Sequence, residues 1–485
     1  MLPFFKSILK NILRPFARPL LNRIRIIVRE ETEMVILRKT ECAKSFSHSV
    51  EKKQQQQIFY QKSEIISAKN TKREKSEIIN NILFVGDNTD TPNFGCRATG
   101  SALAEILRQF LPITDRICRS ELTQLFKSTP LCDDLRLYLK AVKKHGHESY
   151  ANLLSRIKKV DAVVLNGEGS FIFQSPPRKD LHYYFVILSA CIEAGIPFYI
   201  LNAMFTAFAD EPLNTELVNQ AMPILEQAEV FATRDFQSMQ IIQQYSNERV
   251  NVTFIPDALF SWYSVFDEHK TIFNNMIANS RFILPFVDNN SFYSDLDFSH
   301  PYALFSGNSF ASWHYDQALN SFVKLAAALK NQAEKLGIHL YLIETCNGDA
   351  VLRQVALITG IPFIPVITNI YFAGSILGNA QCYVSGRYHP SILASLSGTP
   401  CVFMGANSHK TLSLQTVLEI PQEEQVLFPA IPDDLAIPQI VSLFEKTVMN
   451  QDRGKVRKIC EKNSVIVKDR ITALFTKESL SLIKG

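Results

Sequence analysis

From residue 81 onward, short apolar runs alternate with helical stretches, and this rhythm constrains the fold more than any other feature of the chain. A first group of apolar runs lies at 82–85, 162–165, 197–201, 230–233 and 252–255. A second group lies at 338–343, 361–366, 381–385 and 400–404. Short continuous apolar strands separated by helices are typical of parallel sheets that are covered on both faces. The sequence therefore predicts an α/β fold.

The alternation is interrupted between about residues 262 and 312, where Asn, Ser, Asp and aromatic residues are frequent and one apolar run, 282–287, predicts a strand. A chain of 485 residues also exceeds what one ordinary core holds. We therefore predict two α/β domains, at 79–265 and 266–432, followed by C-terminal helices over 433–485. Ligands bind at the carboxyl ends of parallel strands, so the two domains should enclose a ligand-binding cleft.

The first 78 residues differ from the rest in charge and in pattern. Residues 1–29 carry seven Lys or Arg and no Asp or Glu, and apolar residues recur at helical spacing between Phe4 and Phe16. This pattern predicts a basic amphipathic helix, which is followed by a polar linker that extends to residue 78. Such a helix either lies on an anionic membrane surface through residues 1–28, or packs on the protein itself or on another subunit.

Composition excludes several classes of protein. The net charge is +4, and the chain is close to neutral without its basic N-terminal segment, which argues against a nucleic-acid-binding protein. The nine Cys are scattered singly with no C-x-x-C pair, so neither a disulfide framework nor a zinc site is expected. The expected location is a reducing cytoplasm. No apolar run approaches the roughly 18 residues that a membrane-spanning helix needs.

The strongest single motif is Ser385–Ser391, in which an apolar strand leads through Gly386 into a helix that Pro390 opens. The residue before Pro avoids helical dihedrals, so we predict His389 as the helix cap. Arg387 and His389 lie two positions apart in extended chain, which turns both side chains to one side. A guanidinium, an imidazole and helix amides then converge on a spot that suits a phosphate or a carboxylate. Two solvated polar side chains at a strand end are the alternative.

Two motifs follow predicted strands early in the first domain. Asn93 and Gly95 precede a helix whose amides favour an anion, and Gly95 allows a ligand to approach the backbone closely. A structural turn is the alternative. The second motif, Asn166–Ser170, places Glu168 between two glycines after a buried strand. This arrangement predicts an exposed acid that accepts a proton from a sugar hydroxyl, or a Glu that is merely solvated in a turn.

Three further charged residues stand at strand ends. Arg234 either binds an anion or pairs with Asp235, and Asp257 is a helix cap or a binder of hydroxyl groups. Lys410 is either a second cation for a phosphate or a solvated surface residue. A group of aromatic and amide side chains, which suits an acceptor glycan or the packing of a loop, comprises Asn289, Asn290, Phe292, Tyr293, Trp313, His314 and Tyr315.

Taken in order, these motifs resemble the polysaccharide pyruvyl transferase family over about residues 81–412. The matching pieces are Asn93-x-Gly95-Cys96-x-Ala98, Asn166–Ser170, Arg234-Asp235 with Ser238, Pro256-Asp257, and Gly386-Arg387-x-His389 with Gly398-x-Pro400. The resemblance implies two Rossmann-like domains in a GT-B-like arrangement with a cleft between them; the N-terminal helix and linker lie outside it. It also implies transfer of the enolpyruvyl unit of phosphoenolpyruvate onto two hydroxyls of one sugar, which forms a cyclic ketal and releases phosphate.

The resemblance implies that His389 transfers the proton and that Arg387 and Arg234 bind the anionic groups of the donor. A helix N-terminus lowers the pKa of His389 and a bound phosphate dianion raises it, so we expect a competent acid only when donor is bound. Glu168 or Asp257 is the candidate base for the attacking hydroxyl. The other predicted substrate-binding residues are Lys410, Asn93, Gly95, Asn166 and Ser170.

No metal and no cofactor are expected beyond phosphoenolpyruvate as the donor substrate. The expected partners are this donor and a glycan or lipid-linked saccharide acceptor, and the expected location is the cytoplasm, with peripheral contact at the inner membrane face as a further expectation. Two other functions stay open. One is a nucleotide-sugar-dependent glycosyltransferase, although residues 340–430 lack the two Glu eight positions apart that retaining members often carry. The other is a non-catalytic glycan-binding or assembly protein.

Overall fold

The computed structural model describes residues 79–476, apart from 128, 209–210, 270, 273–274, 276–295, 367 and 451. All described residues belong to a single unit of the chain, Arg73–Leu482. The predicted N-terminal helix, the polar linker and the strand at 282–287 lie outside the described residues. So do four members of the aromatic and amide group: Asn289, Asn290, Phe292 and Tyr293.

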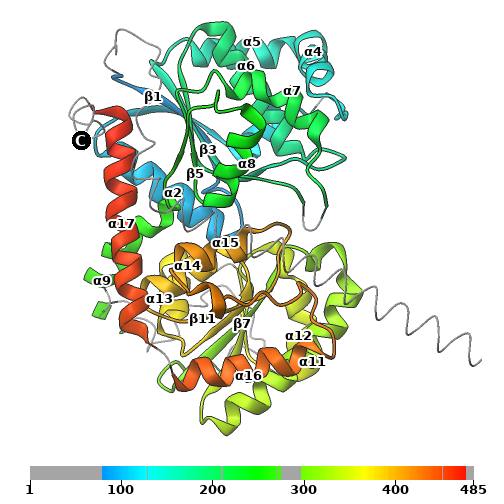
Figure 1. The fold of residues 1–485 in the computed structure, drawn as a ribbon, viewed down its shortest axis with the longest axis vertical. Coiled ribbons are helices and arrows are strands. Elements are labelled where there is room, and N and C mark those ends of the chain that lie inside the picture. The colour runs from blue at the N-terminus through cyan, green and yellow to red at the C-terminus, as the bar shows by residue number, and fades with distance from the viewer. Residues whose placement is uncertain are drawn as a thin grey trace, which may run out of the picture. The chain divides into compact units, whose positions relative to one another are not determined.

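The first of two parallel sheets contains six strands in the order β2-β1-β3-β4-β5-β6 (Figure 1). These strands are β1 (Ile82–Asp87), β2 (Ile113–Cys118), β3 (Ala162–Ile172), β4 (Phe198–Thr206), β5 (Val230–Thr233) and β6 (Val252–Phe254). Successive side chains point to opposite faces. Leu83 and Val85 of β1 therefore enter one hydrophobic cluster, and Ile82 and Phe84 enter another.

Helices cover both faces of this sheet. The helix that packs on the Ile82 and Phe84 face is α2 (Phe94–Arg108). Those that contribute to the cluster on the other face are α3 (Arg119–Leu125), α4 (Leu135–His145), α5 (His147–Ile157), α6 (Lys179–Ala194), α7 (Thr215–Leu225) and α8 (Phe236–Ser246). After β6 the chain continues through the short helices η1 (Ala258–Trp262) and α9 (Tyr263–Glu268).

The second sheet contains five parallel strands in the order β11-β10-β7-β8-β9. These strands are β7 (Tyr302–Asn308), β8 (His339–Ile343), β9 (Phe363–Ile364), β10 (Tyr383–Gly386) and β11 (Cys401–Phe403). Helices on one face are α11 (Tyr315–Lys335), α12 (Val351–Thr359) and α16 (Ala436–Met449). Those on the other face are α13 (Ile370–Asn379), α14 (Tyr388–Leu396) and α15 (Lys410–Val417). Short 3-10 helices are η4 (Ala311–Trp313), η5 (Asn347–Asp349) and η6 (Gln422–Glu424).

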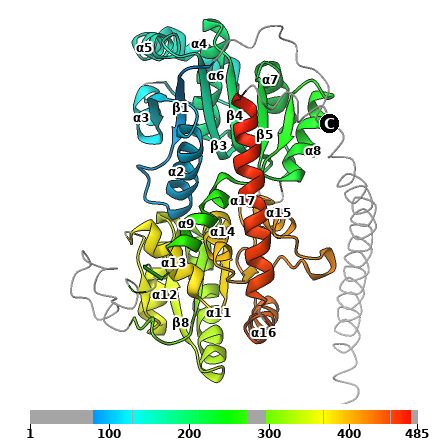
Figure 2. The ribbon, with the colours of Figure 1, turned by 90° about the vertical axis from the view of Figure 1, so that its left-hand side faces the viewer.

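The C-terminal helix α17 (Arg453–Phe475) links the two sheets. It contacts α14 of the second sheet and α2, η1 and α9 on the side of the first, and Figure 2 shows it running past both. The ring of Phe475 lies 4.6 Å from that of Tyr199 in β4. Arg470 Nη1 donates a hydrogen bond to the carbonyl oxygen of Phe254 at the end of β6, at 2.6 Å. The end of the chain thus packs on the first sheet.

Two parallel sheets, each covered by helices on both faces, confirm the predicted α/β class with two Rossmann-like domains. The strands fall within the predicted ranges 79–265 and 266–432, while the domain boundaries themselves stay a prediction. Two strands, β2 and β7, were not among the predicted apolar runs. Within the described residues, no helix is both long enough and apolar enough to cross a membrane.

Candidate functional site

Most of the predicted site residues lie where strands of the two sheets end. Arg234 directly follows β5, and Asp257 caps η1 after β6. From the second sheet, Arg387 and His389 follow β10 at the start of α14, and Lys410 begins α15 after β11. Residues that are far apart in sequence are therefore brought to facing strand ends.

His389 contacts two first-sheet residues through a single ring nitrogen. Its Nε2 lies 3.1 Å from Asp257 Oδ2 and 2.9 Å from Arg234 Nη1. Arg234 Nη1 also donates to Asp257 Oδ2, at 3.1 Å. The other carboxylate oxygen, Oδ1, accepts from Thr99 Oγ1 at 2.7 Å and from the Leu259 amide at 3.0 Å. The side chains of His389, Arg234 and Asp257 are only 10%, 2% and 0% exposed, so these contacts are largely shielded from water.

The surroundings of Asp257 keep it ionised. Burial alone would raise its pKa, but the charge and hydrogen bond of His389, and then the charge of Arg234, hold the pKa well below the usual range of a carboxyl group. Both oxygens already accept hydrogen bonds. Asp257 is therefore placed to stabilise positive charge on its neighbours, rather than to take a proton from an incoming hydroxyl.

The shared nitrogen of His389 creates a conflict between its two neighbours. A protonated Nε2 donates to Asp257 but then faces a second donor, Arg234; an unprotonated Nε2 accepts from Arg234 but then faces a carboxylate. Arg234 also stacks over the ring of Tyr388, with Cζ 4.2 Å from the centroid, and its buried Nε has no hydrogen-bond partner among the described residues. An anion that attracted Arg234 would leave Asp257 as the partner of Nε2 and would favour the protonated ring.

Arg387 takes a different partner from His389, and their predicted convergence on one anion stays a prediction. Arg387 Nε and Nη2 donate to Asp349 Oδ1 at 3.0 and 2.6 Å, and the second oxygen of Asp349 accepts from the Thr345 amide and hydroxyl. The reason is local. Helix α14 begins at Tyr388 with the extended Arg387 as its N-cap, so Tyr388 and His389 are helical and the segment 387–389 is not extended throughout. His389 accordingly lies in the first helical turn and is not the cap.

Lys410 is partly buried among other cations. Its Nζ donates to Ser309 Oγ at 2.9 Å and to Asn407 Oδ1 at 2.7 Å, and among the described residues no carboxylate pairs with it. Burial, followed by the positive charges of Arg387, Arg234 and Arg178, lowers the pKa of Lys410 to about 7. The side chain is thus not a solvated surface Lys. Lys410, Arg387, Arg234 and Arg178 thus form a group of four neighbouring cations. Sequence reasoning missed Arg178, which is the N-cap of α6 and follows two prolines.

Glu168 is buried, so the prediction of an exposed acid in a turn is wrong. Strand β3 does not stop at Leu165 but continues through the glycine-flanked segment to Ile172, pairing with β4. Glu168 adopts a left-handed conformation, with φ 40°, and its Oε1 accepts from the side-chain amides of Asn88 at 2.6 Å and Asn166 at 3.2 Å. The carboxylate is engaged by buried donors.

Asn166 belongs to a buried hydrogen-bond chain that reaches Asp257. Its Oδ1 accepts from Asn202 Nδ2 at 3.1 Å, and the same Asn202 nitrogen donates to Thr99 Oγ1 at 2.8 Å. Thr99 in turn donates to Asp257. Asn202 Oδ1 accepts from the Ala258 amide at 3.0 Å, directly beside Asp257. Sequence reasoning gave no role to Thr99, although it closes the segment that begins at Asn93, and it missed Asn202, for which the signal was a single Asn inside the apolar strand β4.

The remaining predicted residues have structural neighbours in the same region. Asn93 caps α2, its Oδ1 accepting from the Cys96 amide at 3.1 Å. Gly95 lies in the first turn of α2, where an added Cβ would come within 2.5 Å of His389 Cβ and 2.7 Å of Nδ1. Glycine is therefore needed for the close approach of His389 rather than of a ligand. Ser170 is buried at the end of β3, where its hydroxyl interacts with Tyr184.

A second His–Asp pair joins the two sheets. His409 Nε2 lies 3.0 Å from Asp235 Oδ1, and Nδ1 lies 2.9 Å from Thr206 Oγ1. Burial would raise the pKa of Asp235, but the charge and hydrogen bond of His409, together with the donors of Ser238, lower it. Asp235 therefore pairs with His409, and the alternative that it pairs with Arg234 is not what the structure shows.

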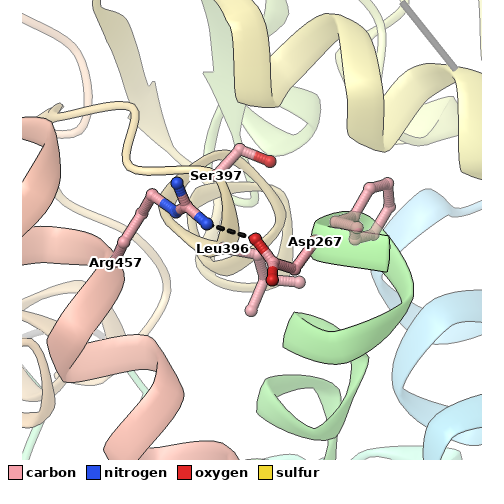
Figure 3. Close-up of a pocket in the computed structure, with 5 residues that line it drawn as sticks. Asp267, Leu396, Ser397 and Arg457 are labelled. Atoms are coloured by element: carbon pink, nitrogen blue, oxygen red, sulfur yellow. Dashed lines mark hydrogen bonds and ion pairs between the residues drawn. The ribbon is translucent and has the colours of Figure 1, made fainter. Parts of the chain in front are cut away.

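The hollow in Figure 3 lies away from these residues. It is lined by Phe266, Asp267, Leu396, Ser397 and Arg457, and Arg457 of α17 pairs with Asp267 of α9 across it. Leu396 and Ser397 stand at the C-terminal end of α14, whereas His389 stands at its start. Among the described residues, no three His, Cys, Asp or Glu side chains are grouped so that they could hold a metal ion.

Comparison with known proteins gives one family and several distant structures. The family model described as polysaccharide pyruvyl transferase matches residues 93–408, more than half of the chain. A search of curated proteins gives no significant match. Similar solved structures include UDP-N-acetylglucosamine 2-epimerase from Rickettsia bellii (12% identity, covering 84% of this chain and 98% of that one, TM-score 0.48). Another is Arabidopsis thaliana UGT89C1 complexed with UDP-L-rhamnose (10% identity, covering 82% and 100%, TM-score 0.46). At these values the two structures have no bearing on what this chain binds.

Proposed function

Because the chain belongs to the polysaccharide pyruvyl transferase family, we propose that it transfers the enolpyruvyl unit of phosphoenolpyruvate onto two hydroxyls of one glycan sugar. The products are a cyclic pyruvate ketal and inorganic phosphate. The observation that carries this proposal is the position of His389, whose Nε2 is shared between a carboxylate and a guanidinium in a cluster of cations. An anionic donor that needs a proton fits such a site.

The cations suit the two anionic groups of the donor. Phosphoenolpyruvate carries a carboxylate and a phosphate, and Arg binds both kinds of group through two parallel hydrogen bonds. Among the described residues, the buried Nε of Arg234 has no hydrogen-bond partner and Lys410 has no carboxylate partner. Arg387 is held by Asp349 through Nε and Nη2, which fixes its direction and leaves Nη1 for a ligand. A bound dianion would relieve the mutual repulsion of these side chains.

His389 is the proposed acid. Its Nδ1 side packs on the first turn of α2 at Gly95, so Nε2 is the nitrogen that faces Arg234 and Asp257. When the donor attracts Arg234, Asp257 stabilises the imidazolium. Nε2 then gives its proton to the methylene carbon of the donor, which makes the neighbouring carbon electrophilic. Asp257 stabilises the positive charge of His389 and fixes the orientation of its ring. It takes this role in place of the role as base that the sequence suggested.

The remaining steps balance without a further reactant. The first sugar hydroxyl attacks the electrophilic carbon and loses a proton, which restores the proton that His389 gave up. Phosphate leaves as the second hydroxyl attacks, and the proton of that hydroxyl departs on the phosphate. Two carbon–oxygen bonds form to the sugar, one carbon–oxygen bond to phosphate breaks, and the methylene group becomes a methyl group.

Incubation of the purified chain with phosphoenolpyruvate and an extracted glycan pool tests the proposal. We expect phosphate release that depends on glycan, and mass spectrometry should find glycans that have gained a pyruvate ketal. The matched control is His389→Ala, which should release no phosphate. If thermal shifts respond to nucleotide sugars but not to phosphoenolpyruvate, the chain is a glycosyltransferase instead. Binding of glycan without any product would indicate a binding or assembly protein.

A lipid-linked acceptor would place the reaction at the cytoplasmic face of a membrane. The seven basic residues within 1–29 support this proposal, since they would be attracted to anionic lipid. Co-sedimentation with anionic vesicles compares the full chain with a chain that lacks residues 1–78. Equal sedimentation of the two would rule out a membrane role for the N-terminal segment.

A further inference from the structure

An exposed group of aromatic rings lies at the facing strand ends of the two sheets. Trp313, in the short helix η4 after β7, is 51% exposed, and its ring centroid lies 4.6 Å from that of Phe208, which follows β4 of the first sheet. Phe310 stacks on His314 at 4.4 Å. By contrast the other tryptophan, Trp262, is 1% exposed and donates its Nε1 hydrogen to Glu105. We call Phe208, Phe310, Trp313 and His314 the aromatic shelf.

The backbone under the shelf is held in place. The amides of Phe310 and Ala311 both donate to Asn308 Oδ1, each at 2.9 Å, at the point where β7 ends. This side chain therefore caps the turn that presents Trp313. A ring that merely packed down a loop would be buried, but Trp313 keeps half of its surface in water on a fixed support.

The aromatic shelf lies next to the cations Lys410, Arg387, Arg234 and Arg178. The segments that follow β7 and β4 both make this connection. Ser309, next to Phe310, accepts the hydrogen bond of Lys410. Ser312, next to Trp313, lies beside Gly348 on the same side as Arg387: a Cβ added to Gly348 would meet Arg387 Nη2 at 3.1 Å and Ser312 Oγ at 3.8 Å. On the first sheet, Thr206 stands two residues before Phe208 and contacts His409. A molecule on the shelf would thus be adjacent to the proposed donor.

We infer that the aromatic shelf binds the apolar face of a sugar ring, the one that receives the pyruvyl unit. This inference rests on the proposed function, because the acceptor sugar must reach the donor carbon beside His389. An exposed tryptophan offers a flat apolar surface to the C–H face of a pyranose, while hydroxyl groups stay free to react or to bind polar neighbours. Sugar stacked on Trp313 would present its hydroxyls toward the side of Ser312 and Arg387.

Fluorescence gives a test that does not need turnover, since the chain has two tryptophans. In Trp262→Phe the emission comes from Trp313 alone, and in Trp313→Phe it comes from Trp262 alone. The probes are the methyl β-glycosides of galactose, glucose, mannose and N-acetylglucosamine. We expect at least one of them to change the emission of Trp262→Phe saturably and to leave that of Trp313→Phe unchanged.

Kinetics supply the second readout, with the glycan pool as acceptor. Trp313→Ala should raise the KM for glycan about tenfold, since loss of a stacked aromatic contact costs roughly one order of magnitude in affinity. The KM for phosphoenolpyruvate should stay unchanged, and Trp313→Phe should restore most of the glycan affinity. Leu435→Ala, at an exposed apolar residue directly before α16, is the matched surface control.

The outcomes separate the shelf from the donor chemistry. An unchanged KM for glycan in Trp313→Ala, together with no emission change in Trp262→Phe, overturns the shelf while leaving ketal formation intact. A saturable emission change without phosphate release would support a sugar site in a protein whose proposed chemistry is wrong. An equal rise in the KM values of glycan and donor would show that Trp313 supports the whole site, and would overturn the assignment to the acceptor.

Discussion

Lys410 gives the sharpest test of the donor site, because its pKa sets how donor binding depends on pH. In the free protein, burial and three neighbouring cations lower the pKa to about 7, against a usual value of 10.5. A bound phosphate dianion would favour the charged ammonium and raise the pKa again. Above pH 7, therefore, the free protein carries a neutral Lys410 that must take up a proton when phosphoenolpyruvate binds.

The magnitude follows from linkage. If the bound pKa lies well above 9, protonation of Lys410 alone raises the Kd for phosphoenolpyruvate about fifty-fold between pH 7 and 9, or roughly 2.3 kcal/mol. The donor does not contribute to this slope, because the second pKa of a phosphate is about 6. Lys410→Arg keeps its charge throughout and Lys410→Met never carries one, so both should lose this part of the pH dependence, and Lys410→Met should also bind the donor weakly.

Isothermal titration calorimetry measures both the Kd and the proton uptake, when buffers with different ionisation heats are compared. At pH 8 we expect the wild type to take up nearly one proton more per donor than Lys410→Met, because the proton that His389 requires is common to both. A Kd that changes less than about threefold between pH 7 and 9 would refute the reasoning. The same slope in Lys410→Met would refute it as well, since another group would then be responsible.

Four further substitutions probe the rest of the site. His389→Ala should abolish phosphate release while calorimetry still detects donor binding. Arg387→Lys should weaken donor binding about tenfold, because Lys cannot keep the two contacts with Asp349 that direct Nη1 toward the donor. Normal turnover in either variant would remove the role assigned to that residue. Thr99→Val removes the hydroxyl that donates to Asp257, at a cost of roughly 1 kcal/mol, and should shift the pH profile of kcat; an unshifted profile would exclude Thr99 from positioning. Gly95→Ala adds a Cβ within 2.5 Å of His389, so Tm and phosphate release should both fall. This would occur although Ala normally stabilises a helix by about 1 kcal/mol over Gly. A rise in Tm with full activity would contradict the packing argument.

Periodicity in the sequence was enough to predict most strands, but two were missed for identifiable reasons. Strand β2 (Ile113–Cys118) lies at the edge of its sheet and carries Asp115 and Arg116, so it lacks a continuous apolar run. Strand β7 (Tyr302–Asn308) is central and fully buried, yet its second half reads Ser306-Gly307-Asn308. Those polar residues are satisfied by neighbours such as the Tyr383 hydroxyl, and no local pattern reveals such partners.

The site was predicted in its residue types but not in its contacts. The order of motifs brought Arg234, Asp257 and His389 together as candidates, because parallel strands deliver their ends to one edge of each sheet. Which of them touch depends on how the two sheets face each other. The His389 partner Asp257 stands 132 positions away along the chain. Helix α14 starts two residues earlier than expected, and Arg387, its N-cap, pairs with Asp349.

Three residues of the site lack a suitable hydrogen-bond or charge partner among the described residues, and one ligand could satisfy all three. Within the part of the chain that the structure describes, the buried Nε of Arg234 has no partner. His389 has one nitrogen between a donor and a carboxylate, and Lys410 lies among like charges. Each arrangement is unfavourable when the site is empty, because buried polar groups and charges need partners. A single ligand with two negative groups would satisfy Arg234, free His389 for Asp257 and recharge Lys410. Donor binding would then be coupled to protonation of both His389 and Lys410, because the negative charge of the donor favours both charged forms. A neutral sugar brings no such charge, so it should leave the pKa of Lys410 at about 7.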